Sequence, residues 1–213
     1  MYANQYSLGG YYTGLAGWEF SIEGYYKQMR HILEYQDGVS FFGTSTNWEE
    51  KVEMGEGRSF GLEMMVQKTL GKTTGWLAYT LAKTDHRFKD GAISQGKWFP
   101  YKYDRRHTIS LCLNHKFSER IDVGASWIFN TGGCITVPER ETIIIRPEGN
   151  IESAPYISRR NNYRLPASHR LNLGINFNKK TKHGMRTWNI SLYNAYNAMN
   201  PVSYTHLRAH ETL

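Results

Sequence analysis

The sequence has 213 residues, of which 40% are hydrophobic and 14% aromatic, and its formal net charge at pH 7 is +7. Twenty glycines against six prolines are typical of turns and strands rather than of disorder. A membrane-spanning helix needs about 20 consecutive apolar residues, and no apolar run here approaches that length, so such a helix is excluded. Membrane strands remain compatible with the mean hydropathy of −0.59, because a spanning strand needs only about 9–11 residues, half of them polar.

The positive charge does not predict nucleic-acid binding, because the 26 Lys and Arg residues are scattered along the chain instead of forming a basic patch. Two cysteines are too few for a disulfide framework or a zinc site. No serine stands in a nucleophile-elbow motif and the histidines lack ligand spacing. We therefore expect no catalytic residues, no metal ligands, no cofactor and no nucleic-acid partner, and we expect that the protein is not an enzyme.

The strongest signal is an alternation of apolar and polar residues with a period of two, which predicts half-buried β-strands. Within 109–117, for example, Ile109, Leu111 and Leu113 alternate with Ser110 and Cys112. A helical pattern is absent. The pattern predicts an all-β fold with about eight antiparallel strands in up-and-down order, near 5–12, 18–27, 59–68, 75–84, 107–117, 122–131, 168–178 and 187–196.

The links between these strands alternate strictly between short and long. The links at 13–17, 69–74, 118–121 and 179–186 are short, whereas those at 28–58, 84–106 and 132–167 are long. Short turns at one end of a sheet and long loops at the other are typical of outer-membrane β-barrels. A soluble β-sandwich or lipocalin-like fold is the alternative, since its strands also alternate.

In a barrel, the apolar side of each strand contacts lipid and the polar side lines the lumen. The apolar side should then form one continuous band across the sheet. The residues that we expect to face lipid are Phe20, Ile22, Leu111, Leu113, Trp127, Leu173, Ile175, Ile190 and Leu192.

Several motifs, taken in chain order, resemble the TonB-dependent outer-membrane receptors. The resemblance covers most of residues 5–201 and agrees with the alternation of the links. The motifs are GRSFGLE (57–63), GWLAYTLAKT (75–84), KWFPYKYDRRH (97–107), YRLP (163–166), HRLNLG (169–174) and LYNAYNAMNP (192–201).

The resemblance implies a 22-stranded transmembrane barrel with a plugged lumen, of which residues 1–201 are a C-terminal portion. It implies the cell outer membrane as location and TonB-dependent uptake of a nutrient, of the siderophore, cobalamin or glycan class, as function. A plug domain and the TonB energy-coupling system would then be partners in the full-length protein. Residues 202–213 depart from the family and resemble a translated sequencing adaptor, so we expect a non-native tail there.

In such a receptor the long loops recognise the ligand, and their aromatic side chains are candidates for stacking on it. The candidates are Trp48, Trp98, Tyr101 and Tyr103. Two other functions stay open: a self-contained eight-stranded outer-membrane barrel with a structural role, and a soluble lipocalin-like binding protein.

Overall fold

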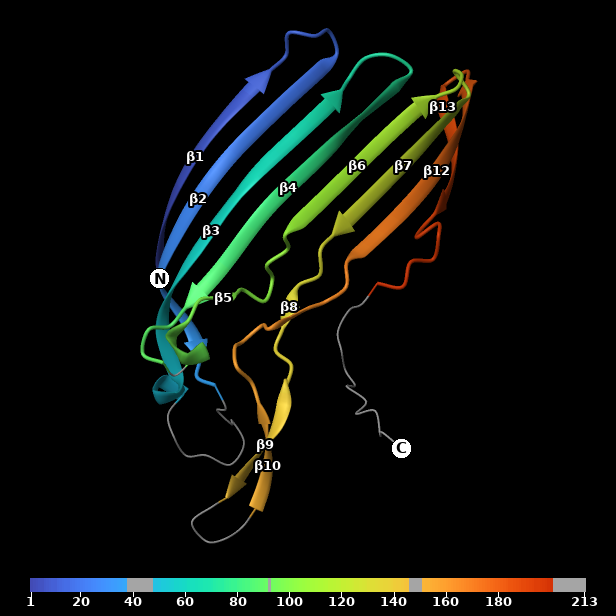
Figure 1. Ribbon diagram of the computed structural model, residues 1–213. Coiled ribbons are helices and arrows are strands. Elements are labelled where there is room, and N and C mark those ends of the chain that lie inside the picture. The colour runs from blue at the N-terminus through green and yellow to red at the C-terminus, as the bar shows by residue number, and fades with distance from the viewer. Residues whose placement is uncertain (38–47, 92, 146–150, 201–213) are drawn as a thin grey trace.

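The computed structural model describes residues 1–37, 48–91, 93–145 and 151–200, and the tail expected at 202–213 lies outside the described residues. One curved antiparallel sheet dominates the molecule (Figure 1). Its strands follow one another in meander order, which confirms the predicted fold class. They are β1 (Tyr2–Tyr12), β2 (Trp18–Tyr35), β3 (Val52–Lys68), β4 (Thr73–Arg87), β6 (His107–Lys116), β7 (Ile121–Asn130), β12 (Ser168–Thr181) and β13 (Gly184–Leu192).

The sheet is open, because β1 pairs only with β2 and β13 pairs only with β12 among the described residues. All four short turns lie at one end of the sheet, and the long links leave from the other end, which we call the rim (Figure 1). In the described part of the chain, no helix is both long enough and apolar enough to cross a membrane.

The register places the expected lipid-facing residues on one side of the sheet, which we call the apolar face. Residues that are directly paired in neighbouring strands share a face. Two of the cross-strand rows are Phe20–Val66–Leu77–Leu111–Trp127–Leu171 and, nearer the short turns, Leu113–Ala125–Leu173–Leu192. The band is therefore continuous across the sheet, whereas its contact with lipid stays a prediction.

The opposite side, the polar face, carries side chains that bond to one another across strands. The Asp122 carboxylate accepts hydrogen bonds from the amides of Asn176 at 2.7 Å and Asn178 at 2.6 Å. Asn189 donates in turn to the side-chain oxygen of Asn176 at 2.7 Å. This network spans β7, β12 and β13. The polar side chains of this face therefore find their hydrogen-bond partners in one another.

The long links form short elements of their own at the rim. The segment β5 (Phe99–Pro100) extends the sheet beside the end of β4, and β8 (Cys134–Ile135) pairs with β11 (Tyr163–Arg164). A hairpin of β9 (Arg140–Ile145) and β10 (Ile151–Tyr156) projects beyond the rim (Figure 1). Two short 3-10 helices complete the set, η1 (Trp48–Lys51) and η2 (Ser94–Gly96).

The strands β2 and β3 extend further toward the rim than the sequence predicts, reaching Tyr35 and Val52 instead of ending near 27 and 59. A bulge interrupts their pairing, since Arg30 pairs with Glu56 but Ile32 pairs with Gly55. The extra residue, His31, adopts a positive φ of 54°. The bulge places Ile32 on the polar face in line with Met29, and both contact the buried cluster described next.

Candidate ligand-facing rim

The buried apolar residues lie at the rim and not along the band. Phe88 is 1% exposed and Ile93 is 0% exposed, and with Ile32 and Phe99 they form a cluster against which Met29 packs. In the band, by contrast, Leu173 is 38% exposed and Ile190 is 64% exposed. The buried cluster thus forms on the polar-face side of the sheet, and the apolar band is left exposed among the residues described here.

Glycines of β3 make room for this cluster. A Cβ on Gly55 would lie 2.5 Å from the Phe88 ring and 2.6 Å from the carbonyl oxygen of Arg87. This packing role becomes visible only when β4 is placed beside β3.

His86 lies next to the cluster on the same face, opposite Gly57. Its ring stacks on Tyr101, with centroids 4.5 Å apart, and meets Phe99 edge-on at 6.4 Å. Burial lowers the pKa of His86 to about 4. The Asp85 carboxylate raises this pKa, but by less than burial lowers it. The imidazole is therefore neutral at neutral pH and acts as part of an aromatic stack.

Two ion-pair centres connect the long links to one another. The Asp104 side chain is 1% exposed, and its carboxylate accepts the backbone N–H of Thr84 at 2.7 Å and pairs with Arg106 and Arg164. Arg164 also donates to the carbonyl of Gly132 at 2.8 Å. A buried carboxylate held by two guanidinium groups and a backbone donor fixes the 84–106 link against the 132–167 link.

The second centre joins all three long links. The Arg160 side chain pairs with Asp37, while its backbone N–H donates to the hydroxyl of Ser94 at 2.9 Å. The backbone N–H of Ser94 donates to the Asp37 carboxylate at 2.9 Å. The sequence did not indicate Asp37 or Arg160, and Arg164 was noted only within the YRLP motif, because ion pairs between distant links leave no periodic signal.

The four candidate aromatics do not form one site. The guanidinium groups of Arg58 and Arg87 lie over the Trp98 ring, at 4.3 and 4.7 Å from its centroid, and these arginines lie on the apolar face. Tyr101 stacks on His86 and meets Tyr103 edge-on at 5.4 Å. Trp48 is the first residue of η1, and its side chain lies outside the described part of the structure.

Tyr103 is the candidate best placed to contact a ligand. It is 65% exposed, and it lines a hollow of about 270 Å³ together with Lys102, Arg105 and the β8 residues Cys134 and Ile135. The ammonium group of Lys102 lies 4.9 Å from the centre of the Tyr103 ring. An exposed aromatic ring beside cations can stack on a planar group and attract negative charge.

The ionisable side chains at the rim lie mostly in ion pairs. Among the described residues, no group of three or more His, Cys, Asp or Glu side chains is arranged to hold a metal ion. The charged groups that are brought together are paired, and Glu56 illustrates this: burial raises the pKa of its carboxyl, but its ion pairs with Arg87 and Lys89 outweigh burial and leave that pKa lowered.

Comparison with known proteins supports the architecture. The chain superposes on the ferripyoverdine receptor of the outer membrane of Pseudomonas aeruginosa, whose crystal structure was determined bound to ferripyoverdine, with a TM-score of 0.61. The match covers 92% of this chain but 23% of the receptor, at 14% sequence identity. At that identity the likeness shows the fold alone, which is that of part of an outer-membrane receptor barrel.

No protein-family model matches the sequence. No curated protein matches it either.

Proposed function

We propose that this chain is part of a TonB-dependent receptor of the cell outer membrane that takes up a nutrient ligand. The observation that carries the proposal is the open meander with an uncovered apolar face, which superposes on 23% of the length of an outer-membrane receptor. The motifs that resemble the family occur in the order and at the spacing that this fold requires.

The two alternative functions fit the structure less well. A self-contained small barrel needs a ladder between its first and last strands, and β1 and β13 do not pair. A lipocalin-like protein buries its apolar face, but here Leu173, Ile190 and Leu192 are 38%, 64% and 56% exposed. Lipid covering this face accounts for both the exposure and the alternation.

In this proposal the rim is the ligand side of the receptor and acts by binding rather than by catalysis. Tyr103 with Lys102 and Arg105 supplies an aromatic ring beside two cations, which suits an anionic or planar ligand of the siderophore, cobalamin or glycan class. The polar face lines the lumen, where in the full-length protein a plug domain is the partner, and the TonB system supplies the energy.

The test is a set of uptake measurements in the host bacterium. Strains lacking the gene that encodes this chain, or lacking TonB, are compared with wild type for uptake of labelled ferric siderophores, cobalamin and oligosaccharides. We expect one ligand class to lose uptake in both strains, and we expect the protein in the outer-membrane fraction of a density gradient.

A variant links the uptake to the rim. Tyr103→Ala is expected to weaken uptake of that ligand, whereas Tyr12→Ala, at the short-turn end of β1, is expected to leave it unchanged. Recovery of the protein in a soluble fraction, or uptake that persists in both deletion strains for every ligand class, would exclude the proposal.

A further inference from the structure

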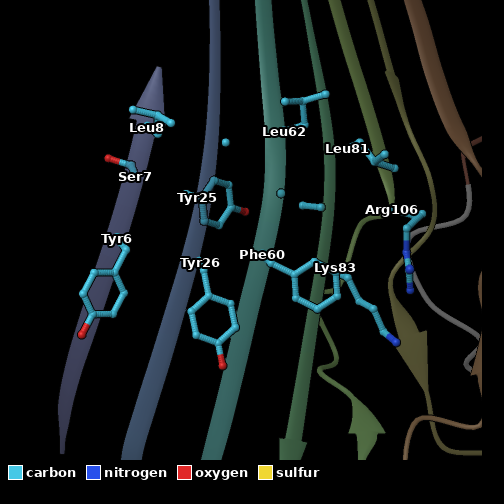
Figure 2. Close-up of a pocket in the computed structure, with 13 residues that line it drawn as sticks. Tyr6, Ser7, Leu8, Tyr25, Tyr26, Phe60, Leu62, Leu81, Lys83 and Arg106 are labelled. Carbon is cyan, nitrogen blue, oxygen red and sulfur yellow. The ribbon is translucent and has the colours of Figure 1, made fainter. Parts of the chain in front are cut away.

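A shallow groove of about 650 Å³ lies on the apolar face near the rim, across β1 to β4 (Figure 2). Side chains of two neighbouring cross-strand rows line it. One row consists of Tyr6, Tyr26, Phe60 and Lys83, and the other of Leu8, Gly24, Leu62 and Leu81.

The groove exists because Gly24 interrupts a row of leucines. Leu8 and Leu62 pair with Gly24 from either side, so their side chains flank a position that has none. A Cβ on Gly24 would find its nearest neighbour, the carbonyl oxygen of Gly61, as far as 4.0 Å away. The space above Gly24 is therefore open and lined by aliphatic carbon, with a size that suits part of an acyl chain.

Cations lie at one end of the groove. Lys83 continues the row of Tyr26 and Phe60, and Arg106 lies beside it (Figure 2). Each of these cations shares its carboxylate with a second cation: Lys83 lies 3.3 Å from Asp85, which also pairs with Arg58, and Arg106 lies 3.4 Å from Asp104, which also pairs with Arg164. Each carboxylate thus leaves an excess of positive charge, and the buried Nε of Arg106 has no hydrogen-bond partner among the described residues. The next row toward the rim adds Arg58.

We propose that this groove is a specific binding site for an anionic, phosphate-bearing membrane lipid. An acyl chain lies in the groove over Gly24, and the head group is held by Lys83 and Arg106. Tyr6 and Tyr26 lie in the same cross-strand row as Lys83, one row closer to the rim than Gly24, where amphipathic rings favour a membrane interface. The inference rests on the proposed function, because it requires that the apolar face contacts lipid. The groove then lies in the membrane leaflet on the long-loop side.

Native mass spectrometry of the full-length protein in a neutral detergent tests the site. The protein is titrated with dipalmitoyl phosphatidylglycerol, with dipalmitoyl phosphatidylcholine of equal chain length, and with glycerol phosphate, which has no chains. Since a cation near the membrane surface attracts anionic lipid by about 1 kcal/mol, two cations predict roughly a tenfold preference or more for the anionic lipid at one site.

Two variants separate the chain from the head group. Gly24→Leu places a side chain in the groove, since a Cβ there would meet nothing closer than 4.0 Å, and is expected to weaken the tight phosphatidylglycerol complex by about tenfold through lost acyl-chain burial. The double variant Lys83→Gln with Arg106→Gln is expected to equalise the two lipids. The matched controls are Ala125→Leu, elsewhere on the apolar face, and Lys179→Gln with Arg186→Gln, a directly paired set on the apolar face at the short-turn end, and both should behave as wild type.

The possible outcomes distinguish the lipid site from the membrane placement of the apolar face. Unweakened phosphatidylglycerol binding by Gly24→Leu, an unchanged lipid preference in the double variant, or glycerol phosphate binding as tightly as the lipid, overturns the site. Equal binding of both lipids by the wild-type protein also overturns the site but leaves the membrane placement of the apolar face standing. Failure of every lipid to bind any form of the protein overturns both.

Discussion

Ile175 and Asn176 are neighbours in β12, but their side chains lie on opposite faces of the sheet. Ile175 pairs with Val123 and Ile190 in the apolar band, while Asn176 bonds to Asp122 and Asn189 on the polar face. In the intact protein we expect Ile175→Arg to cost about 2–4 kcal/mol, because a guanidinium group would face hydrocarbon.

The change Asn176→Arg is the matched control, and we expect it to be tolerated since the new cation lies beside the Asp122 carboxylate. Reversible unfolding by denaturant in lipid vesicles measures both variants. Equal stability of the two would mean that the band does not contact lipid.

At His86 the low pKa links protonation to the stability of the rim. The unfolded imidazole binds a proton near pH 6.5 and the folded one near pH 4, so the stabilisation is complete above pH 6.5 and is lost as the pH falls toward 4. We expect a loss of roughly 3 kcal/mol across that window, localised at the rim.

Hydrogen exchange of the β4 and β5 amides between pH 7 and pH 4, corrected for the intrinsic pH dependence of exchange, measures this loss. The variant His86→Phe keeps an aromatic ring against Tyr101 and cannot be protonated, so its opening free energy should vary less over this range. A wild-type profile as flat as that of the variant would show that His86 does not couple to the rim.

At the scale of elements, the close contact between β3 and β4 depends on glycine. A methyl group at Gly55 would overlap the Phe88 ring and the backbone oxygen of Arg87, which cannot move without displacing β4. We expect Gly55→Ala to destabilise the rim by about 1–3 kcal/mol. Gly24→Ala is the control, because its methyl group enters open space.

Limited proteolysis of the long links reports this difference. Cleavage within 84–106 should accelerate in Gly55→Ala and stay unchanged in Gly24→Ala. If the two variants are cleaved at the same rate, the cluster around Phe88 does not hold the link in place.

The sequence predicts the strands well where one side of a strand is apolar and the other polar. The start of β6 at His107 and the start of β12 at Ser168 coincide with the prediction. The alternation fails where β2 and β3 pass beyond the band, because Met29 and Ile32 there pack against a link while their neighbours face water. The bulge at His31 shifts the alternation by one residue between Met29 and Ile32, so a period of two is interrupted in this segment.

The rim could be predicted only in part. Its position follows from the link lengths, and the aromatic residues of the 84–106 link were identified as candidates. Their separation was not predictable: Trp98 and Tyr101 are three residues apart, but the pairing of β5 with β4 directs them to opposite faces. The pairing of Asp104 with Arg164, and of Asp37 with Arg160, depends on how distant links fold back, which no local pattern encodes.

At the scale of the whole molecule, the sheet has two open edges and an uncovered face. Every residue of β1 and of β13 is exposed. Unpaired N–H and C=O groups along an edge are templates for pairing with another strand. A polypeptide of residues 1–200 alone should therefore self-associate even when detergent covers its apolar face.

Size-exclusion chromatography in detergent, combined with hydrogen exchange, measures this. We expect oligomers of the 1–200 polypeptide in which the β1 and β13 amides are protected, and a monomer for the full-length protein. A monomeric 1–200 polypeptide whose edge amides exchange freely would contradict the expectation.

The bulge at His31 has a consequence for how the length of such a chain can change during evolution. Within the band, adding or removing one residue turns every following side chain to the wrong face, so insertions there are incompatible with the membrane. The bulge lies beyond the band, where one extra residue is absorbed between Arg30 and Ile32 and the pairing of Tyr26 with Phe60 is preserved. Variation in strand length is therefore permitted on the rim side of Arg30 and forbidden on its short-turn side. The ligand side can then diversify in length while the apolar band keeps a fixed length.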